Sequence, residues 1–320
     1  MTNNEFTLDV SIIIVNYNTK QLLADCLNSI YEQTKEISFE VIVSDNGSKD
    51  GSIEMLKTDF PQVILIENNA NLGFGAANNR GLAIAKGKYI FYLNSDTILL
   101  NNAVKCFFDY WENSPEKDSI GALGANLLNI NNETIHSGGS FPDYKSDISG
   151  LIHNIYGFTK QFIFHSLFRK SLPEYQNTKS ERIIGSVDYI TGADLFLENN
   201  DSAYFDEDFF MYCEETYLQY NLSVKNKKRI LIDCVKIIHL EGQSAEKITT
   251  DIVHNEASFA AIQSKLSRII YFKKTGIASI QILVLKILTT LLWLNPFLFK
   301  NTKKYIKYIY HPEKNKKLFY

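Results

Sequence analysis

The chain has 320 residues, of which 45% are hydrophobic and 22% charged, a composition that excludes a disordered or collagen-like protein. This length can bury a substantial core, as one large domain or as one domain with an appendage. The net charge of −3 hides an asymmetry: residues 260–320 carry 12 Lys or Arg and one acidic residue, which leaves 21 basic and 35 acidic residues in the first 259. This segment predicts an anionic partner, and its apolar character favours a membrane over nucleic acid.

The opening residues and the cysteines indicate a compartment. The opening MTNNEFTLD has neither a basic nor an apolar region, so we expect no secretory signal. The cysteines are far apart and show no CxxC spacing, which argues against a zinc site or a disulfide framework. They are Cys26, Cys106, Cys213 and Cys234. We therefore expect a protein of the reducing cytoplasm.

The first hundred residues alternate between apolar strand patterns and helical patterns. The predicted strands are Val10–Val15, Phe39–Ser44, Val63–Ile66 and Tyr89–Leu93, and the predicted helices are Gln21–Gln33, Ile53–Thr58 and Asn71 to about Ala85. This alternation predicts an α/β fold with right-handed crossovers and a mostly parallel central sheet flanked by helices. Because the strands end in polar residues, we expect Asn16–Asn18, Asp45–Ser48 and Asn94–Asp96 along one rim, where such sheets bind ligands.

The stretch Lys88–Leu100 (KYIFYLNSDTILL) carries the clearest chemical signal. A buried strand ends abruptly in Asn94, Ser95 and Asp96, and apolar residues resume four positions later. A carboxylate held there is suited to binding a divalent cation against a diphosphate, because hard cations prefer oxygen ligands. The alternative is that Asp96 caps a following helix.

Gly73 to Asn78 (GFGAAN) superficially resembles a dinucleotide fingerprint. It lies in the third strand-to-helix unit rather than the first, so we reject a dehydrogenase. The glycines more plausibly let a helix N-terminus approach a phosphate or a sugar closely.

The next part of the chain is less regular. Asn101–Trp111 predicts a helix and Gly121–Ile130 a strand and turn, whereas Phe141–Ser180 has no clear period and predicts a loop-and-helix excursion over the site. After it, Ile184–Leu197 predicts strand, turn and strand, and Arg229–Cys234 and Val235–Ile238 are strand material ending at His239.

Two adjacent carboxylates, Glu214 and Glu215, open a predicted helix. Neighbouring helix positions differ by about 100°, so only one of the two can point squarely into a cleft. The glutamates and His239 also have purely structural interpretations. Acids are favoured at a helix N-terminus, and His239 can be a hydrogen-bonded residue at the end of a strand.

Seven motifs in order, VSIIIVNYN, SDNGSKDGS, NLGFGAANNRG, YIFYLNSD, VDYITGADLF, FDEDFFMYCEE and IIHLEG, make residues 10–244 similar to the family 2 glycosyltransferases. The pattern most resembles the branch of rhamnosyltransferases and related bacterial polysaccharide enzymes. The resemblance implies a GT-A type nucleotide-diphospho-sugar transferase fold and an inverting displacement with a divalent cation, Mn or Mg, on the leaving diphosphate.

The resemblance also implies roles for individual residues. The donor-binding residues would be Asn16, Tyr17, Asn18, Asp45, Gly73, Gly75, Asn78, Asn94, Ser95 and Asp96, with Asp45 on the base or ribose. The acceptor-binding residues would be Asp188, Gly192, Ala193 and Asp194. The metal ligands would be Asp96, in a family Asp-x-Asp motif whose first Asp is Asn here, and His239.

A catalytic base is implied at the family's Glu-Asp-x-Asp motif, where this chain has Glu214-Glu215-Thr216-Tyr217. Glu215 matches the base position with one extra methylene, and Glu214 is the second candidate. Tyr217 replaces the second acid, which puts acceptor binding in doubt.

The C-terminal segment Gly276–Phe299 is long enough to span a bilayer, but Lys286 lies in its middle and four lysines follow it. We expect an amphipathic helix lying on the inner face of the cell membrane, with a spanning helix and helix packing in a homodimer as alternatives. The predicted division is residues 1–245 for the transferase domain, with a donor half (1–100) and an acceptor half (101–245), and 246–320 for a helical, basic, membrane-associating region.

The function predicted from the sequence is transfer of a sugar, from dTDP-rhamnose or a UDP-sugar, to a saccharide acceptor that is lipid-linked, in bacterial cell-surface polysaccharide synthesis. A catalytically silent partner with the same fold is the alternative. A nucleotidyltransferase would need a Gly-rich, basic N-terminal loop for a triphosphate, and VNYNTKQ lacks it. No nucleic-acid partner is expected.

Overall fold

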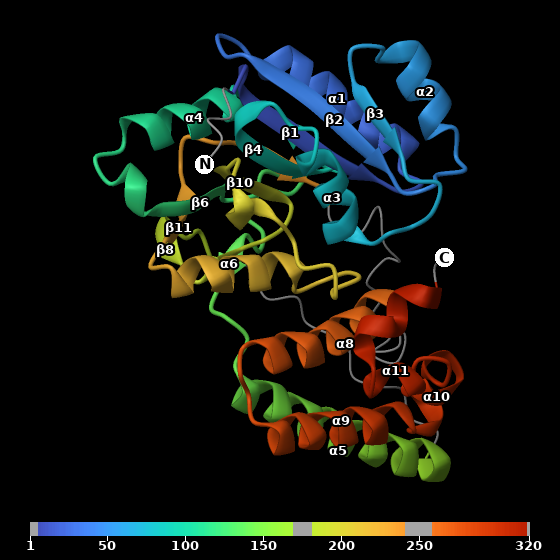
Figure 1. Ribbon diagram of the computed structural model, residues 1–320. Coiled ribbons are helices and arrows are strands. Elements are labelled where there is room, and N and C mark those ends of the chain that lie inside the picture. The colour runs from blue at the N-terminus through green and yellow to red at the C-terminus, as the bar shows by residue number, and fades with distance from the viewer. Residues whose placement is uncertain (1–5, 169–180, 241–257, 319–320) are drawn as a thin grey trace.

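The computed structural model describes residues 6–168, 181–240 and 258–318 (Figure 1). Its centre is an eight-stranded sheet in the order β3-β2-β1-β4-β10-β6-β11-β8. The strands are β1 (Leu8–Asn16), β2 (Phe39–Asp45), β3 (Ile64–Glu67), β4 (Gly87–Asn94), β6 (Ile120–Ala125), β8 (Gly185–Val187), β10 (Asp194–Glu198) and β11 (Lys228–Ile232). The strands β3, β2, β1 and β4 pair in parallel with their neighbours, and β6 pairs in parallel with β11. β10 pairs antiparallel with β4 and β6, and β8 pairs antiparallel with β11. The prediction of a mostly parallel α/β sheet is confirmed.

Helices cover both faces of the sheet, as the unbroken apolar run in β1 requires. Ile12 and Ile14 belong to the core under α1 (Lys20–Gln33), α2 (Ser52–Asp59) and α4 (Ala103–Asn113), whereas Ile13 points to the opposite core. That opposite core includes residues of α3 (Phe74–Leu82) and α6 (Glu214–Val224). This alternation fixes the register of β1, and with it the place where its polar end emerges.

The chain remains extended after Asp96, so the helix-cap alternative for this residue is wrong. β5 (Thr97–Leu99) follows directly and pairs antiparallel with β12 (Ile237–His239), and α4 begins only at Ala103. A second small sheet pairs β7 (Gly138–Gly139) with β9 (Tyr189–Ile190). Three short 3-10 helices complete the described elements: η1 (Lys117–Ser119), η2 (Asp201–Ala203) and η3 (Pro312–Leu318).

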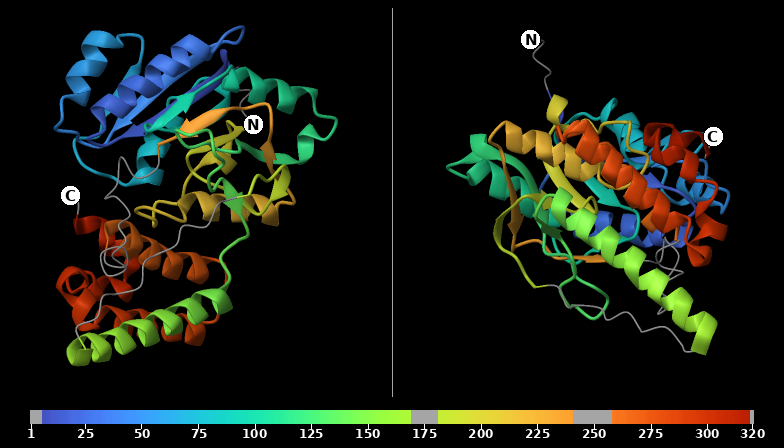
Figure 2. Two further views of the ribbon diagram at one scale, coloured as in Figure 1. Left: turned by 180° about the vertical axis from the view of Figure 1, so that it is seen from behind. Right: turned by 90° about the horizontal axis from the view of Figure 1, so that it is seen from below.

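The long helix after β7 and the C-terminal helices form a layer on the far side of α6 from the sheet (Figures 1 and 2). The layer consists of α5 (Tyr144–Phe168), α8 (Phe259–Lys274), α9 (Ser279–Trp293), α10 (Pro296–Thr302) and α11 (Ile306–Ile309). The excursion predicted at 141–180 thus contains a long helix, α5, which packs against α9, while its residues 169–180 lie outside the described chain.

The helical layer and the segment that precedes α6 share one hydrophobic core. Phe209 and Cys213 cluster with the buried faces of α8 and α9. Ser267 Oγ donates to the Met211 carbonyl at 2.7 Å, and Lys274 Nζ lies 2.8 and 2.7 Å from Asp206 and Asp208. The layer therefore supports the acidic and aromatic segment that leads into Glu214.

Among the described helices, none is long and apolar enough to cross a bilayer. α9 has 15 residues, which at 1.5 Å per residue is about 22 Å, against a hydrocarbon core of roughly 30 Å. The spanning alternative for Gly276–Phe299 is wrong, because the chain turns into α10 at Pro296.

Candidate active site

The ends of β1 and β2 are joined by a network of side-chain hydrogen bonds. Asn16 Nδ2 donates to Asp45 Oδ2 at 2.7 Å and to Ser48 Oγ at 3.0 Å. Asp45 Oδ1 accepts from the backbone N–H groups of Gly47 and Ser48, and the residue is fully buried. The carboxylate therefore shapes the loop after β2, and its contact with a base or ribose stays a prediction.

The turn after β1 leaves a ring available at the rim. Asn18 adopts a positive φ of 55°, which asparagine tolerates better than most residues, and its Oδ1 accepts from Lys49 N at 2.7 Å. This turn leaves Tyr17 48% exposed. An exposed aromatic ring beside a polar rim is able to stack on a base, and the role of Tyr17 in donor binding stays a prediction.

The triplet at the end of β4 meets β12. Because β12 pairs with β5 so that His239 lies opposite Thr97, the imidazole faces the residues just before β5. His239 Nε2 lies 3.2 Å from Asp96 Oδ1 and 3.4 Å from Asn94 Nδ2. Ser95 Oγ lies 3.0 Å from Thr19 Oγ1, which connects the triplet to the turn after β1. The two metal ligands predicted from distant parts of the sequence thus lie together.

One carboxylate and one imidazole suit a cation that is shared with substrate. The side chains of Asp96 and His239 are 4% and 13% exposed. Among the described residues, no group of three or more His, Cys, Asp or Glu side chains could hold a metal ion without other ligands. Mg²⁺-type sites commonly take one or two protein ligands and complete their shell with phosphate oxygens and water, whereas structural zinc sites are closed by four protein ligands. The pair fits the former.

The glycines after β3 pack against the segment that precedes α6. Gly73 has a φ of +88°, and a Cβ there would lie 2.1 Å from the Phe210 carbonyl oxygen. A Cβ on Gly75 would lie 2.9 Å from Phe205 Cβ and 3.6 Å from Glu214 Cβ. The atoms that approach the Cβ positions of these glycines belong to residues 205–214 of the chain itself, so this packing requires glycine there. Contact of their backbone with the donor stays a prediction.

Two adjacent asparagines on α3 behave differently. The predicted donor residue, Asn78, is 1% exposed, and its Nδ2 donates to the Phe74 carbonyl within its own helix at 3.2 Å. Asn79 was not among the predicted site residues; its Nδ2 donates to the Phe205 carbonyl at 2.8 Å and its Oδ1 accepts from Phe205 N at 2.9 Å. Asparagine is a poor helix former, so two in succession inside a helix were the available signal.

The two glutamates at the start of α6 have different surroundings. Glu214 is 3% exposed, and its Oε2 has no hydrogen-bond partner among the described residues. Burial, and then the charge of Glu215, raise the pKa of Glu214 well above its ordinary value. Burial also raises the pKa of Glu215, which is partly exposed and whose Oε1 accepts from Thr216 Oγ1 at 3.1 Å.

A strained turn sets the direction of these carboxylates. Tyr212 and Cys213, directly before Glu214, have φ values of 67° and 64°, a conformation that costs energy for residues other than glycine. Consecutive strained residues of this kind persist where the surrounding structure holds them and are common at functional sites.

The residues predicted for acceptor binding lie in different places. A Cβ on Gly192 would lie 3.5 Å from Glu215 Cβ, so Gly192 borders that side chain. Ala193 is 2% exposed and packs in the core on the opposite face of the sheet from α6. Asp194 is 0% exposed, and its Oδ2 accepts from Ala125 N at 2.6 Å. Burial raises the pKa of Asp194 well above its ordinary value. The structure therefore does not bring Asp194 to an acceptor surface, because its buried side chain hydrogen-bonds β10 to the end of β6.

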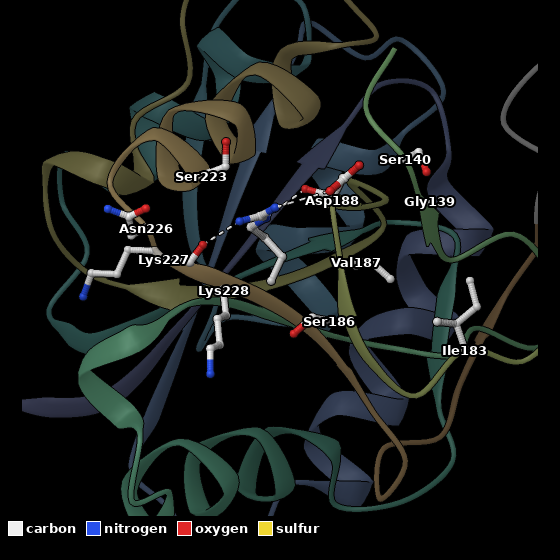
Figure 3. Close-up of a pocket in the computed structure, with 11 residues that line it drawn as sticks. Gly139, Ser140, Ile183, Ser186, Val187, Asp188, Ser223, Asn226, Lys227 and Lys228 are labelled. Carbon is white, nitrogen blue, oxygen red and sulfur yellow. Dashed lines mark hydrogen bonds and ion pairs between the residues drawn. The ribbon is translucent and has the colours of Figure 1, made fainter. Parts of the chain in front are cut away.

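Asp188 lines a separate pocket of about 520 Å³ at the β8 edge of the sheet (Figure 3). Arg229 Nε donates to the Asp188 backbone carbonyl at 2.8 Å, and Asp188 Oδ2 accepts from Phe141 N at 3.1 Å. Ser223 of α6 also lines this pocket, and it is eight residues beyond Glu215, about 12 Å along the helix. Glu215 is not among the residues that line this pocket.

A family model described as glycosyl transferase family 2 matches residues 11–172. A poly(ribitol-phosphate) beta-glucosyltransferase of Bacillus spizizenii is 33% identical over 122 residues, which cover 36% of this chain and 19% of that protein. A UDP-Glc:alpha-D-GlcNAc-diphosphoundecaprenol beta-1,3-glucosyltransferase of Escherichia coli is 35% identical over 122 residues, which cover 35% of this chain and 48% of that protein. The match thus spans less than half the length of either relative.

Among solved structures, the chain is similar to a mannosyltransferase of Pyrobaculum calidifontis in complex with GDP-Man and Mn²⁺. The TM-score is 0.51 at 15% identity, and the alignment covers 94% of this chain and 74% of the other. At this identity the likeness concerns the fold alone, and it bears out the GT-A type fold predicted from the sequence.

Proposed function

The chain belongs to glycosyl transferase family 2, and from this premise we propose that it transfers a sugar from a nucleotide-diphosphate sugar to a saccharide acceptor in the synthesis of a bacterial cell-surface polysaccharide. The observation that carries the proposal is the meeting of Asp96 and His239 at 3.2 Å, on a polar rim built from the ends of β1, β2 and β4. The names of the relatives support this class of reaction, while the rhamnosyltransferase branch stays a prediction.

Asp96 and His239 would hold a divalent cation, Mn or Mg, which when bound neutralises charge on the leaving diphosphate. Tyr17 would stack on the base, and the Asn94 amide would help to orient the diphosphate. Each of these groups projects from the end of a strand or the turn after it, so the site is held rigidly before the donor binds.

Glu215 would accept the proton of the attacking acceptor hydroxyl, in an inverting displacement on the face opposite the diphosphate. It is the more exposed of the two glutamates, and it borders Gly192, which would receive the acceptor. The buried Glu214, whose pKa burial raises strongly, would stay protonated and serve to position the turn. A raised pKa for Glu215 suits a base that must take and release a proton near neutral pH.

The acceptor is proposed to be lipid-linked, because the Escherichia coli relative acts on a diphosphoundecaprenol-linked sugar by its name. Such an acceptor would bring the protein to the inner face of the cell membrane through residues 246–320. Within that segment, residues 246–257 lie outside the described chain.

Turnover with a panel of nucleotide sugars tests the proposal. With Mn²⁺ present, the wild type should release nucleotide from one donor in the presence of an acceptor extract, and Glu215→Gln should lower kcat by at least about 100-fold, the scale of general base catalysis. Glu214→Gln is the matched control one residue away. It should retain most of the activity, because a protonated carboxyl and an amide are both neutral and have nearly the same size and shape. Equal losses in both variants would contradict the assignment of the base.

The second candidate function is a catalytically silent partner with the same fold. It is favoured by Tyr217, which stands where the family has an acid and whose ring packs 5.5 Å from Phe209 with Lys274 Nζ 5.8 Å above it. Tyr217 is thus part of the support for the segment before α6 rather than an acceptor ligand. A protein that binds nucleotide with metal but turns over no donor would favour this candidate.

A further inference from the structure

The outward side of α9 is an unbroken stripe of exposed aliphatic side chains. Six residues with exposures from 39% to 67% form this outer stripe: Ile280, Leu283, Val284, Ile287, Leu291 and Leu294. Their spacing of one, three or four positions places them on one side of a helix. The opposite side, with Leu285, Leu292 and Trp293, is buried in the core shared with α8. Packing explains the buried side of α9 and leaves the outer stripe without a partner among the described residues.

An outer helix face of this kind is unusual for a surface in water. A surface helix normally shows charged and polar residues opposite its buried face, and a contiguous apolar patch marks an interaction site. The outer stripe runs over 14 residue steps, about 21 Å, which is shorter than a bilayer core of roughly 30 Å. A partner for this stripe must therefore contact the helix along its side, because the helix is too short to cross a bilayer end to end.

Four exposed lysines follow the outer stripe along the chain. Lys300, Lys303, Lys304 and Lys307 are exposed, and none forms an ion pair with another described residue. Residues 260–320 carry 12 basic side chains and one acidic side chain. Partly exposed rings, Phe299 at 41% and Tyr310 at 45%, accompany the lysines. Aliphatic residues beside lysines and aromatic rings match the boundary between acyl chains and anionic headgroups.

The same charges argue against a dimer in which the two copies of α9 run parallel. A two-fold interface places the same patch on both sides, so a parallel dimer through the outer stripe would bring the lysines of one copy close to those of the other. Like charges across an interface oppose association. An anionic lipid surface would instead attract the lysines.

We propose that the outer stripe of α9 and the lysines at 300, 303, 304 and 307 form a surface that docks flat on an anionic lipid bilayer. The inference deepens the proposed lipid-linked acceptor, although the docking itself does not depend on turnover. α8 lies between α9 and α6 (Figures 1 and 2), so the start of α6 with Glu215 stands about two helix diameters, roughly 20 Å, from the lipid. An acceptor sugar must therefore project from the headgroup layer to reach the base.

Vesicle flotation with the full chain tests the docking surface. The wild type should float with vesicles of phosphatidylcholine and phosphatidylglycerol, and bind at least tenfold less to phosphatidylcholine alone or at high salt. Leu283→Asn combined with Ile287→Asn should weaken binding to the anionic vesicles at least tenfold. Ile130→Asn is the control, because Ile130 is also an exposed aliphatic residue, at 67%, but does not lie on α9.

Further measurements keep the outcomes distinct. Nucleotide binding and thermal unfolding of the Leu283/Ile287 variant should match the wild type, which excludes misfolding and separates docking from the proposed transfer. The inference is overturned if the wild type does not float, if the double variant floats like the wild type, or if sedimentation velocity shows that the substitutions dissociate a dimer without changing flotation.

Discussion

The paired hydrogen bonds between Asn79 and Phe205 join the donor side of the site to the segment that carries the glutamates. Asn79→Ala removes a donor to the Phe205 carbonyl at 2.8 Å and an acceptor for Phe205 N at 2.9 Å, at a residue that is 5% exposed. Leaving a buried polar group unpaired costs about 1–3 kcal/mol. Two such groups give an expected loss in the free energy of unfolding of about 2–6 kcal/mol.

Urea unfolding followed by circular dichroism measures this loss, with Asn78→Ala as the control. Asn78 is equally close to fully buried but donates only to the Phe74 carbonyl of its own helix, so its replacement should cost about 1 kcal/mol. Donor turnover should fall in Asn79→Ala, although the residue would not touch the substrate, because the turn before Glu214 loses its anchor. Equal stability losses in the two variants would refute the reasoning.

Two other substitutions test the packing around the site. Asp194→Asn should keep the bond from Ala125 N and remain folded, whereas Asp194→Ala should lose about 1–3 kcal/mol. Since burial raises the pKa of Asp194, its folded form binds the proton more tightly, so wild-type stability should fall relative to Asp194→Asn as pH rises from about 5 to 8; parallel profiles would contradict this. Gly75→Ala should cost about 1–3 kcal/mol, because its Cβ would lie 2.9 Å from Phe205 Cβ; an unchanged melting temperature would disprove the close packing.

The donor side of the fold could be read from the sequence because its signals are local. Continuous β-branched runs such as that in β1 indicate strands buried on both faces, and the polar residues that end them emerge at one edge of a parallel sheet. The sequence could also pair Asp96 with His239 through the family pattern. The contact itself depends on the β5–β12 ladder, which brings together two short strands that no local pattern connects.

Features that depend on contacts between residues far apart in the sequence could not be predicted from it. The glycines at 73 and 75 look the same in sequence whether a phosphate or another part of the chain approaches them, and here the segment 205–214 does. Burial of Asp194 follows from the insertion of β10 between β4 and β6, which makes a polar residue part of a sheet interior. The apolar C-terminal segment predicted a membrane-facing helix, but only the packing of α9 on α8 shows which residues remain outside.

Nucleotide binding measured by calorimetry tests the central claim most directly. UDP, dTDP and GDP would be titrated with and without Mn²⁺ into the wild type, Asp96→Asn and His239→Gln. We expect one nucleotide to bind in a metal-dependent way, and each substitution to remove the dependence on metal while the melting temperature is preserved. Metal-independent binding that both variants retain, or no binding by the wild type with metal present, would contradict the assignment of Asp96 and His239 to a cation-assisted donor site.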